Sequence, residues 1–104
     1  MREGEIVTVF RNRLRPEHST EYEAMAPEIY TLAAAMPGFL ELKTFTADDG
    51  ERVSIVRFAD EATQRAWRDQ ARHREAQRAG RERFYSAYSI QVCRCLSVRE
   101  HPAG

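Results

Sequence analysis

The chain has 104 residues, of which 42% are hydrophobic and 31% charged, a size and balance typical of one globular domain. Acidic and basic residues number 16 each, which argues against nucleic acid as the main partner because phosphate neutralisation needs a basic excess. No apolar stretch approaches the roughly 20 residues of a membrane helix. We therefore expect one domain over residues 1–100, a short tail at 101–104, and binding to neither nucleic acid nor membrane.

The first five residues are polar and show no secretory signal, which favours a cytoplasmic protein. Cys93 and Cys95 are then expected to be reduced. A Cys-x-Cys pair without matching ligands is a weak metal motif, and side chains two apart on a strand are too distant for an easy disulfide. We interpret both as buried thiols and predict no metal site.

The first half of the chain predicts a strand followed by a helix. Residues 5–14 alternate as a strand does, with apolar side chains on both faces. Pro16 opens a helix, a position where its missing N–H does no harm. Apolar side chains then recur at helical steps as far as Met36, which precedes Pro37 and so leaves the helical region.

The second half predicts a hairpin, a helix and a last strand. Residues 39–47 and 51–59 are rich in β-branched and aromatic residues, and the Asp48-Asp49-Gly50 segment between them is typical of a tight turn. Asp60 is a natural N-cap for a helix that stops near Gly80. Residues 86–99 alternate again and predict the last strand.

The element order is β-α-β-β-α-β, the arrangement of ferredoxin-like α+β domains, with a four-stranded antiparallel sheet and both helices on one face. Several strands have apolar side chains on both faces, yet two helices can cover only one. The uncovered face predicts pairing with a second copy of the chain as a homodimer. The alternative is a monomer with scattered surface hydrophobic residues.

Three residues are candidates for chemistry. Asn12 is in phase with an apolar strand face, so its amide either points into a pocket or bonds a loop at the sheet rim. Trp67, the only tryptophan, is either core or the wall of a cavity for a flat aromatic ligand. His73 is either a general base near neutral pH or a solvated residue of an arginine-rich helix.

Three further residues are candidates for substrate binding. Gln77 lies four residues beyond His73 and shares its helical face. Tyr85 and Tyr88 follow the helix and either present phenols to a cavity or only pack. The arginines between residues 65 and 83 alternate with acidic residues, which is typical of a solvated face; the alternative is a rim that steers anions towards a pocket.

The order and spacing of several short motifs resemble the antibiotic biosynthesis monooxygenase (ABM) superfamily. These are Arg11-Asn12-Arg13-Leu14, Met36-Pro37-Gly38-Phe39, Phe58-Ala59-Asp60-Glu61-Ala62, and Trp67 followed by His73-Arg74-Glu75-Ala76-Gln77. The similarity covers essentially the whole chain. It implies a dimeric α+β barrel with a pocket between each sheet and its helices. Members include cofactor-free oxygenases of aromatic polyketides and quinols, and haem-degrading enzymes.

The resemblance reaches some site residues and not others. In the haem-degrading branch an Asn on the first strand and a Trp on the second helix match Asn12 and Trp67. The axial His, ten residues after the Trp, is replaced by Gln77, and glutamine is a poor iron ligand. In the polyketide branch an aromatic hydroxyl occupies the position of His73.

We therefore predict a monooxygenase that needs no cofactor and acts on a small aromatic, polyketide-like or quinol substrate. The candidate catalytic residues are Asn12, Trp67 and His73. One alternative is a haem-binding or haem-degrading protein. The other is a dimer that binds a small ligand without catalysis, since one fold hosts many roles.

Overall fold

A computed structural model describes residues 1–102; residues 103 and 104, the end of the predicted tail, lie outside the described part. Within residues 1–102 no helix is long and apolar enough to cross a membrane. The elements are, in chain order, strand β1 (Ile6–Leu14), the 3₁₀ turn η1 (Pro16–His18), helix α1 (Ser19–Ala34), strands β2 (Phe39–Thr46) and β3 (Arg52–Phe58), helices α2 (Glu61–Asp69) and α3 (Ala71–Ala79), the π-helical turn η2 (Gly80–Phe84), and strand β4 (Tyr85–Arg94).

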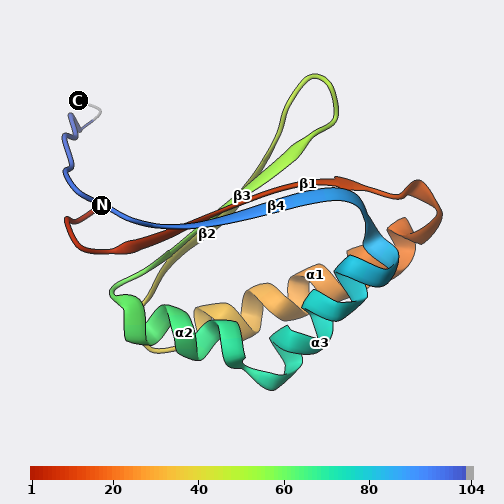
Figure 1. Cartoon of the computed structure of the whole chain (residues 1–104), viewed down its shortest axis with the longest axis horizontal. Coiled ribbons are helices and arrows are strands. Elements are labelled where there is room, and N and C mark those ends of the chain that lie inside the picture. Colours follow the sequence, from red (N-terminus) through yellow and green to blue (C-terminus); the bar gives the residue numbers. More distant parts are fainter. Residues whose placement is uncertain (103–104) are drawn as a thin grey trace.

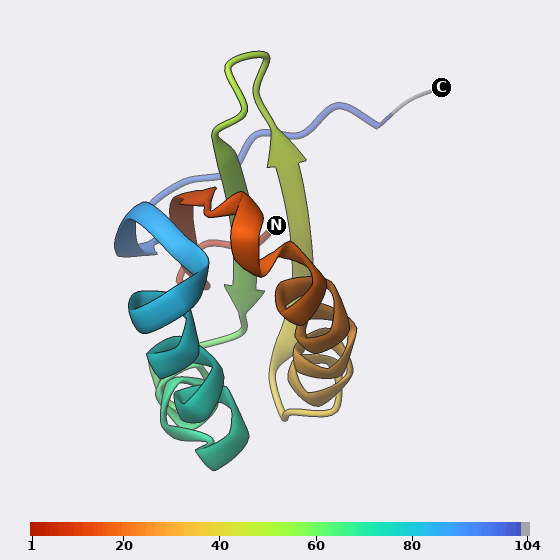
Figure 2. The same cartoon turned by 90° about the vertical axis from the view of Figure 1, so that its right-hand side faces the viewer.

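The four strands form one antiparallel sheet in the order β2-β3-β1-β4. All the helices lie on the same face of this sheet (Figure 1). Seen from the side, α1 and the α2–α3 pair run next to each other beneath it (Figure 2). This arrangement confirms the predicted ferredoxin-like α+β fold.

Two local predictions are confirmed. Gly50 has a φ of 89°, which the β2–β3 turn demands and which glycine accepts without strain. Asp60 caps α2, because its carboxylate accepts a hydrogen bond from the Thr63 amide at 2.9 Å. Gly38, with a φ of 80°, lies so close to this first turn that a Cβ there would come 2.5 Å from Thr63 Oγ1. The corner before β2 is therefore fitted against the start of α2.

The predicted second helix is wrong in one respect, because it is broken at Gln70. Gln70 has an extended ψ of 130°, and its side-chain oxygen accepts a hydrogen bond from the His73 amide at 2.7 Å, which caps the new helix α3. The last strand also differs: β4 ends at Arg94 rather than at residue 99. Two further backbone hydrogen bonds join Cys95 to Gly4 and Glu5, which come just before β1. The N-terminal segment that pairs with the last strand ends there.

Beneath the sheet, the core is small. Ala33, Phe58 and Trp67 are buried, and a shell of partly buried side chains packs on them: Ile29, Leu32, Met36, Phe39, Leu42 and Val56. Phe58 is completely inaccessible to solvent. The core ties α1 and α2 to β2 and β3, so it fixes Trp67 against the sheet.

A buried ion pair lies at the start of β1. Glu5 is 2% exposed and accepts hydrogen bonds from Arg57 Nε at 2.6 Å, Arg57 Nη2 at 3.1 Å and the Arg2 amide at 2.8 Å. The Arg57 hydrogen bond is the largest cause that lowers the pKa of Glu5, against the opposing effect of burial. The carboxylate is therefore charged in the folded protein at neutral pH.

The interpretation of both cysteines as buried thiols is wrong for Cys93. Both are free, but Cys93 is exposed and Cys95 half-buried. Cys93 pairs with Val7 across β1 and β4, on the sheet face away from the helices. Phe45 on the same face is 48% exposed. No helix within residues 1–102 of the chain covers this face.

Candidate active site

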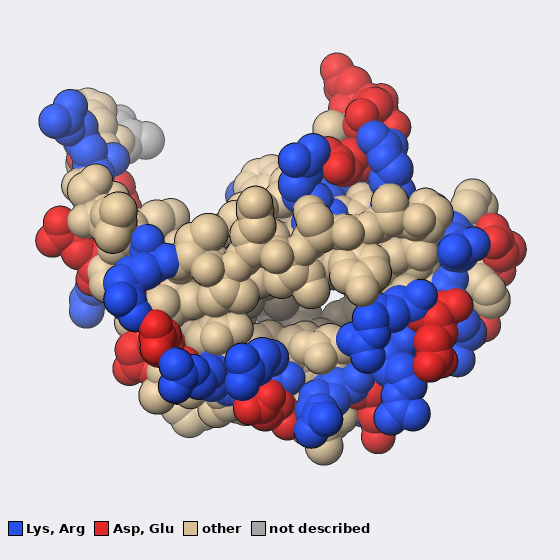
Figure 3. Space-filling model, viewed as in Figure 1, with Lys and Arg blue, Asp and Glu red and all other residues tan. Residues whose placement is uncertain are grey.

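A cavity of about 700 Å³ lies between the sheet and the helices. In the space-filling view it is a hollow below the edge of the sheet, with basic side chains along its lower and right-hand rim (Figure 3). All of the predicted site residues line it: Asn12, Trp67, His73, Gln77, Tyr85 and Tyr88. The fold thus brings together residues that are up to 76 positions apart (88 − 12 = 76).

Asn12 forms the centre of a row of three polar side chains across the sheet. It pairs with Tyr88 of β4 on one side and with Arg52 of β3 on the other. Asn12 is 3% exposed, yet its Oδ1 atom has no hydrogen-bond partner within residues 1–102, and neither has the buried Nη1 atom of Arg52. Buried polar atoms are rarely left unpaired. The Asn12 Oδ1 and Arg52 Nη1 atoms therefore indicate that a bound ligand has polar groups next to them.

The helix break at Gln70 brings His73 onto Trp67. Their rings are stacked, with centroids 3.8 Å apart and planes 11° from parallel. His73 Nδ1 lies 2.9 Å from the Trp67 carbonyl oxygen. A carbonyl has no proton to donate, so Nδ1 carries the hydrogen and Nε2 is left with a free lone pair.

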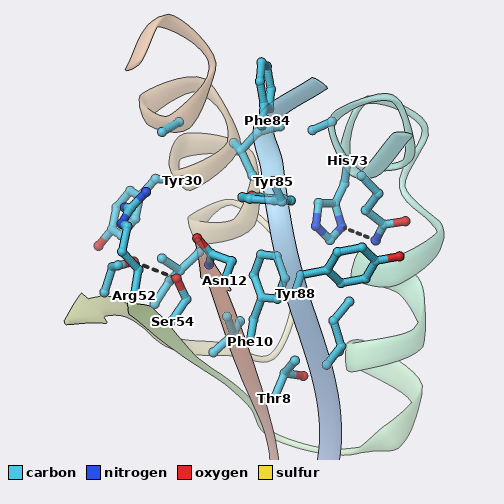
Figure 4. Close-up of a pocket in the computed structure, with 18 of the residues that line it drawn as sticks. Thr8, Phe10, Asn12, Tyr30, Arg52, Ser54, His73, Phe84, Tyr85 and Tyr88 are labelled. Carbon is cyan, nitrogen blue, oxygen red and sulfur yellow. Dashed lines mark hydrogen bonds between the residues drawn. The ribbon is translucent and has the colours of Figure 1, made fainter. Parts of the chain in front are cut away.

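The protonation state of His73 follows from its surroundings. Burial lowers the pKa of His73 below the ordinary 6.5, and the hydrogen bond to the Trp67 carbonyl opposes this only in part. The imidazole is therefore neutral at pH 7. Figure 4 shows the His73 ring turned towards the cavity interior, and the Gln77 amide nitrogen lies 3.4 Å from its Nδ1 atom. A neutral imidazole with a free Nε2 in a cavity can accept a proton.

Aromatic rings make up much of the remaining wall. Phe10 packs edge-on against Tyr85, with centroids 5.2 Å apart, and Tyr22 packs edge-on against Phe84 at 5.8 Å. Burial is the main cause that raises the pKa of Tyr85 well above its ordinary range, so its phenol keeps its proton and can donate a hydrogen bond. Such a wall suits a flat, mostly apolar ligand.

Sequence reasoning missed Arg52. Its guanidinium carbon lies 4.8 Å from the centre of the Tyr22 ring, and Figure 4 places it beside Asn12 and Ser54. A signal was present: Arg52 is in phase with Ser54 and Val56, which also line the cavity. Only the register of β1 against β3 shows that Arg52 is opposite Asn12.

The lining does not fit haem in the position that the resemblance implies. Gln77 stands where an axial histidine is needed, and its amide nitrogen lies 3.4 Å from His73 Nδ1. His73 itself is held flat on Trp67 through its ring and its Nδ1 atom. Within the described residues, no three His, Cys, Asp or Glu side chains lie together as a protein-bound metal ion would need.

The fold and the cavity define a small ferredoxin-like domain built around an aromatic-walled cavity. The family model of antibiotic biosynthesis monooxygenases matches residues 5–79, and the chain belongs to this family. The family-level resemblance read from the motifs is thereby confirmed.

Individual proteins are similar to this chain in sequence or in fold. The uncharacterized protein YqjZ of Bacillus subtilis (strain 168) is 27% identical over 86 residues, which are 83% of this chain and 75% of YqjZ. The structure of Rv0793 from Mycobacterium tuberculosis is similar over 93% of this chain and 100% of its own, with a TM-score of 0.80 and 16% identity. SnoaB, a cofactor-independent oxygenase from Streptomyces nogalater, matches over 94% of this chain and 96% of its own, with a TM-score of 0.74 and 18% identity. At such identities the two structures show a shared fold.

Proposed function

We propose that this protein is a monooxygenase that uses no metal or organic cofactor and oxidises a small electron-rich aromatic, quinol or polyketide-like substrate. The observation that carries the proposal is a neutral histidine with a free Nε2 in an aromatic-walled cavity. Membership of the ABM family and similarity to the fold of a cofactor-independent oxygenase support it.

This reaction requires a base, a pocket that excludes water, and correct positioning of the substrate. His73 Nε2 takes the acidic proton of the substrate, and the resulting anion is electron-rich enough to reduce dioxygen. One oxygen atom forms a bond to a substrate carbon. The O–O bond then breaks, and the second oxygen leaves as water with two hydrogens from the substrate, so that a phenol or anthrone becomes a quinone.

Four other cavity residues support His73 in this scheme. Trp67 holds the His73 ring through stacking and through its carbonyl oxygen, so that the base keeps one tautomer and one orientation. Tyr85, protonated and half-buried, donates a hydrogen bond to a substrate oxygen, and Tyr88 and Gln77 flank the same space. Exclusion of water strengthens these interactions, and positioning supplies much of the rate.

The test is oxygen uptake with anthrone, whose oxidation to anthraquinone consumes one O₂ and releases one water. Loss of general base catalysis in His73→Ala should lower kcat by about 10²–10⁴-fold. His18→Ala is the matched control, because His18 is outside the cavity lining. Equal activity of the His73→Ala variant and the wild type would remove the proposed base, and no protein-dependent oxygen uptake from anthrone or a simple quinol would refute the oxygenase.

We also propose that the protein works as a homodimer. The sheet face away from the helices presents Val7, Val9 and Ile55 next to Phe45, which is 48% exposed. Burying a side chain of this kind is worth about 1.5–3 kcal/mol, so a second sheet packed on this face would be strongly stabilised. Sedimentation equilibrium should give twice the chain mass of 12.0 kDa, and Phe45→Glu should favour the monomer. A wild-type monomer at micromolar concentration would refute the dimer.

A further inference from the structure

We propose that the cavity holds the substrate mono-anion that His73 generates, with its ionised ring oxygen on Arg52 and a neighbouring hydroxyl group donating to Asn12. This deepens the proposed function and rests on it, since it takes the same cavity as the substrate site. Three independent features of the cavity carry the inference: its charge, its unpaired polar atoms and their register on the sheet.

The cavity lining is basic although the chain as a whole is neutral. Among the described residues, none of those that line it is Asp or Glu, while four are basic: Lys43, Arg52, Arg68 and Arg81. Lys43 holds its ammonium 5.3 Å from the centre of the Phe45 ring, on the other face of the sheet, so the three arginines supply the charge. The other titratable groups in the lining are His73 and four tyrosines, at positions 22, 30, 85 and 88. With no carboxylate in the lining, the field inside the cavity favours a negative charge.

Arg52 is the basic group best placed to meet that charge. Within residues 1–102 no carboxylate lies within ion-pair distance of it, whereas Arg68 pairs with Asp69 at 3.0 Å. Its guanidinium lies over the Tyr22 ring, and its Nη1 atom is buried without an acceptor. A buried guanidinium proton without an acceptor is costly, and an anionic oxygen is its strongest partner.

Asn12 supplies the complementary half of the recognition. Facing residues on neighbouring antiparallel strands have Cβ atoms about 5 Å apart, and Asn12 faces Arg52. Its buried Oδ1 accepts hydrogen bonds only, so it requires an O–H or N–H donor, and a hydroxyl group meets this requirement. An ionised oxygen next to a hydroxyl on an aromatic ring presents an acceptor to Arg52 and a donor to Asn12. A dihydroxy-aromatic mono-anion therefore fits both unpaired atoms at once.

The experiment uses alizarin, 1,2-dihydroxyanthraquinone, whose absorption spectrum changes on ionisation and reports the charge of the dye without turnover. Wild-type protein is titrated with the dye across pH, and the titration midpoint of bound dye is compared with that of free dye. A facing cation lowers the pKa of an acid by about one to three pH units, so bound dye should ionise at least tenfold more readily.

The variants separate the anion site from a general effect of the cavity. In Arg52→Gln the titration midpoint of bound dye should return to that of free dye or rise above it. In Arg52→Lys part of the shift in midpoint should remain. Arg65→Gln is a control on the exposed side of α2 and should keep the whole shift. The dimethyl ether of alizarin, which cannot ionise, should bind wild type and Arg52→Gln equally, which shows that the cavity of the variant is intact.

Several results would overturn the proposal: no saturable dye binding to wild type, bound dye that ionises no more readily than free dye, or an Arg52→Gln variant that matches wild type. Oxygen uptake without a dye shift would refute the anion site and leave the oxygenase standing. A dye shift that depends on Arg52, with no oxygen uptake from any substrate, would refute the oxygenase and leave the anion site.

Discussion

The buried Glu5–Arg57 pair predicts a large, pH-dependent loss of stability in Glu5→Gln. The substitution keeps the size of the side chain but removes its charge, so Arg57 keeps only Glu41, at 3.3 Å and 42% exposed. Breaking a buried pair costs about 3–5 kcal/mol. We expect about 3 kcal/mol, because Arg57 is 16% exposed and the glutamine oxygen can still accept one hydrogen bond.

The pH dependence follows from the direction of the shift in pKa. Because the folded state holds the pKa of Glu5 below its ordinary 4.5, the unfolded state takes up the proton first as pH falls. The stability that the charge supplies is complete above about pH 4.5 and disappears as pH falls through the folded pKa. The glutamine variant has no such charge to lose, so the two stability curves should approach each other in acid.

Urea unfolding between pH 7 and pH 3 measures both the loss of stability and its pH dependence. The protein concentration is held the same for both proteins, because self-association makes apparent stability depend on concentration. At pH 7 the melting temperature of the variant should also fall by at least about 10 °C, at about 4–8 °C per kcal/mol for a domain near this size. A difference below about 0.5 kcal/mol at pH 7, the scale of an ordinary surface substitution, would refute the reasoning. So would a difference that stays constant down to pH 3.

Three shorter predictions follow from other parts of the structure. Gly38→Ala should destabilise the protein more than Gly50→Ala in thermal unfolding, because both have positive φ but only Gly38 is pressed against Thr63; equal effects would contradict that contact. Haemin added at micromolar concentration should give no saturable shift of its Soret band, and a saturable shift would restore the haem alternative. The pKa of His73, measured by NMR titration, should lie below its ordinary 6.5, since partial burial disfavours the charged form, and a midpoint above 6.5 would contradict that effect.

The sequence predicted the parts of the fold that depend on local chemistry. The turn at Gly50, the cap at Asp60 and the strand alternation each depend on a few neighbouring residues, and the structure confirms them. The end of β4 was missed because the alternation of its side chains continues to residue 99. The pairing with the N-terminal segment stops at Gly4 and Cys95. Pairing between strands is not visible in the pattern of one strand alone.

The sequence predicted residues that line the cavity, but not how they are arranged there. Asn12, Trp67 and His73 were identified, but a continuous helix would not have stacked His73 on Trp67. The break depends on the side chain of Gln70, which folds back to cap α3, and an isolated glutamine is a weak signal for a helix start. Arg52 was missed because its relation to Asn12 exists only once β1 and β3 are in register.

The stacking of His73 on Trp67 has a practical consequence. Trp67 is the single tryptophan of the chain, so all indole emission comes from a ring in face-to-face contact with one imidazole, 3.8 Å away. An imidazolium quenches a neighbouring indole more strongly than a neutral imidazole does. The fluorescence intensity of Trp67 should therefore report the charge of His73 and the binding of a ligand beside it, without a label or a mutation.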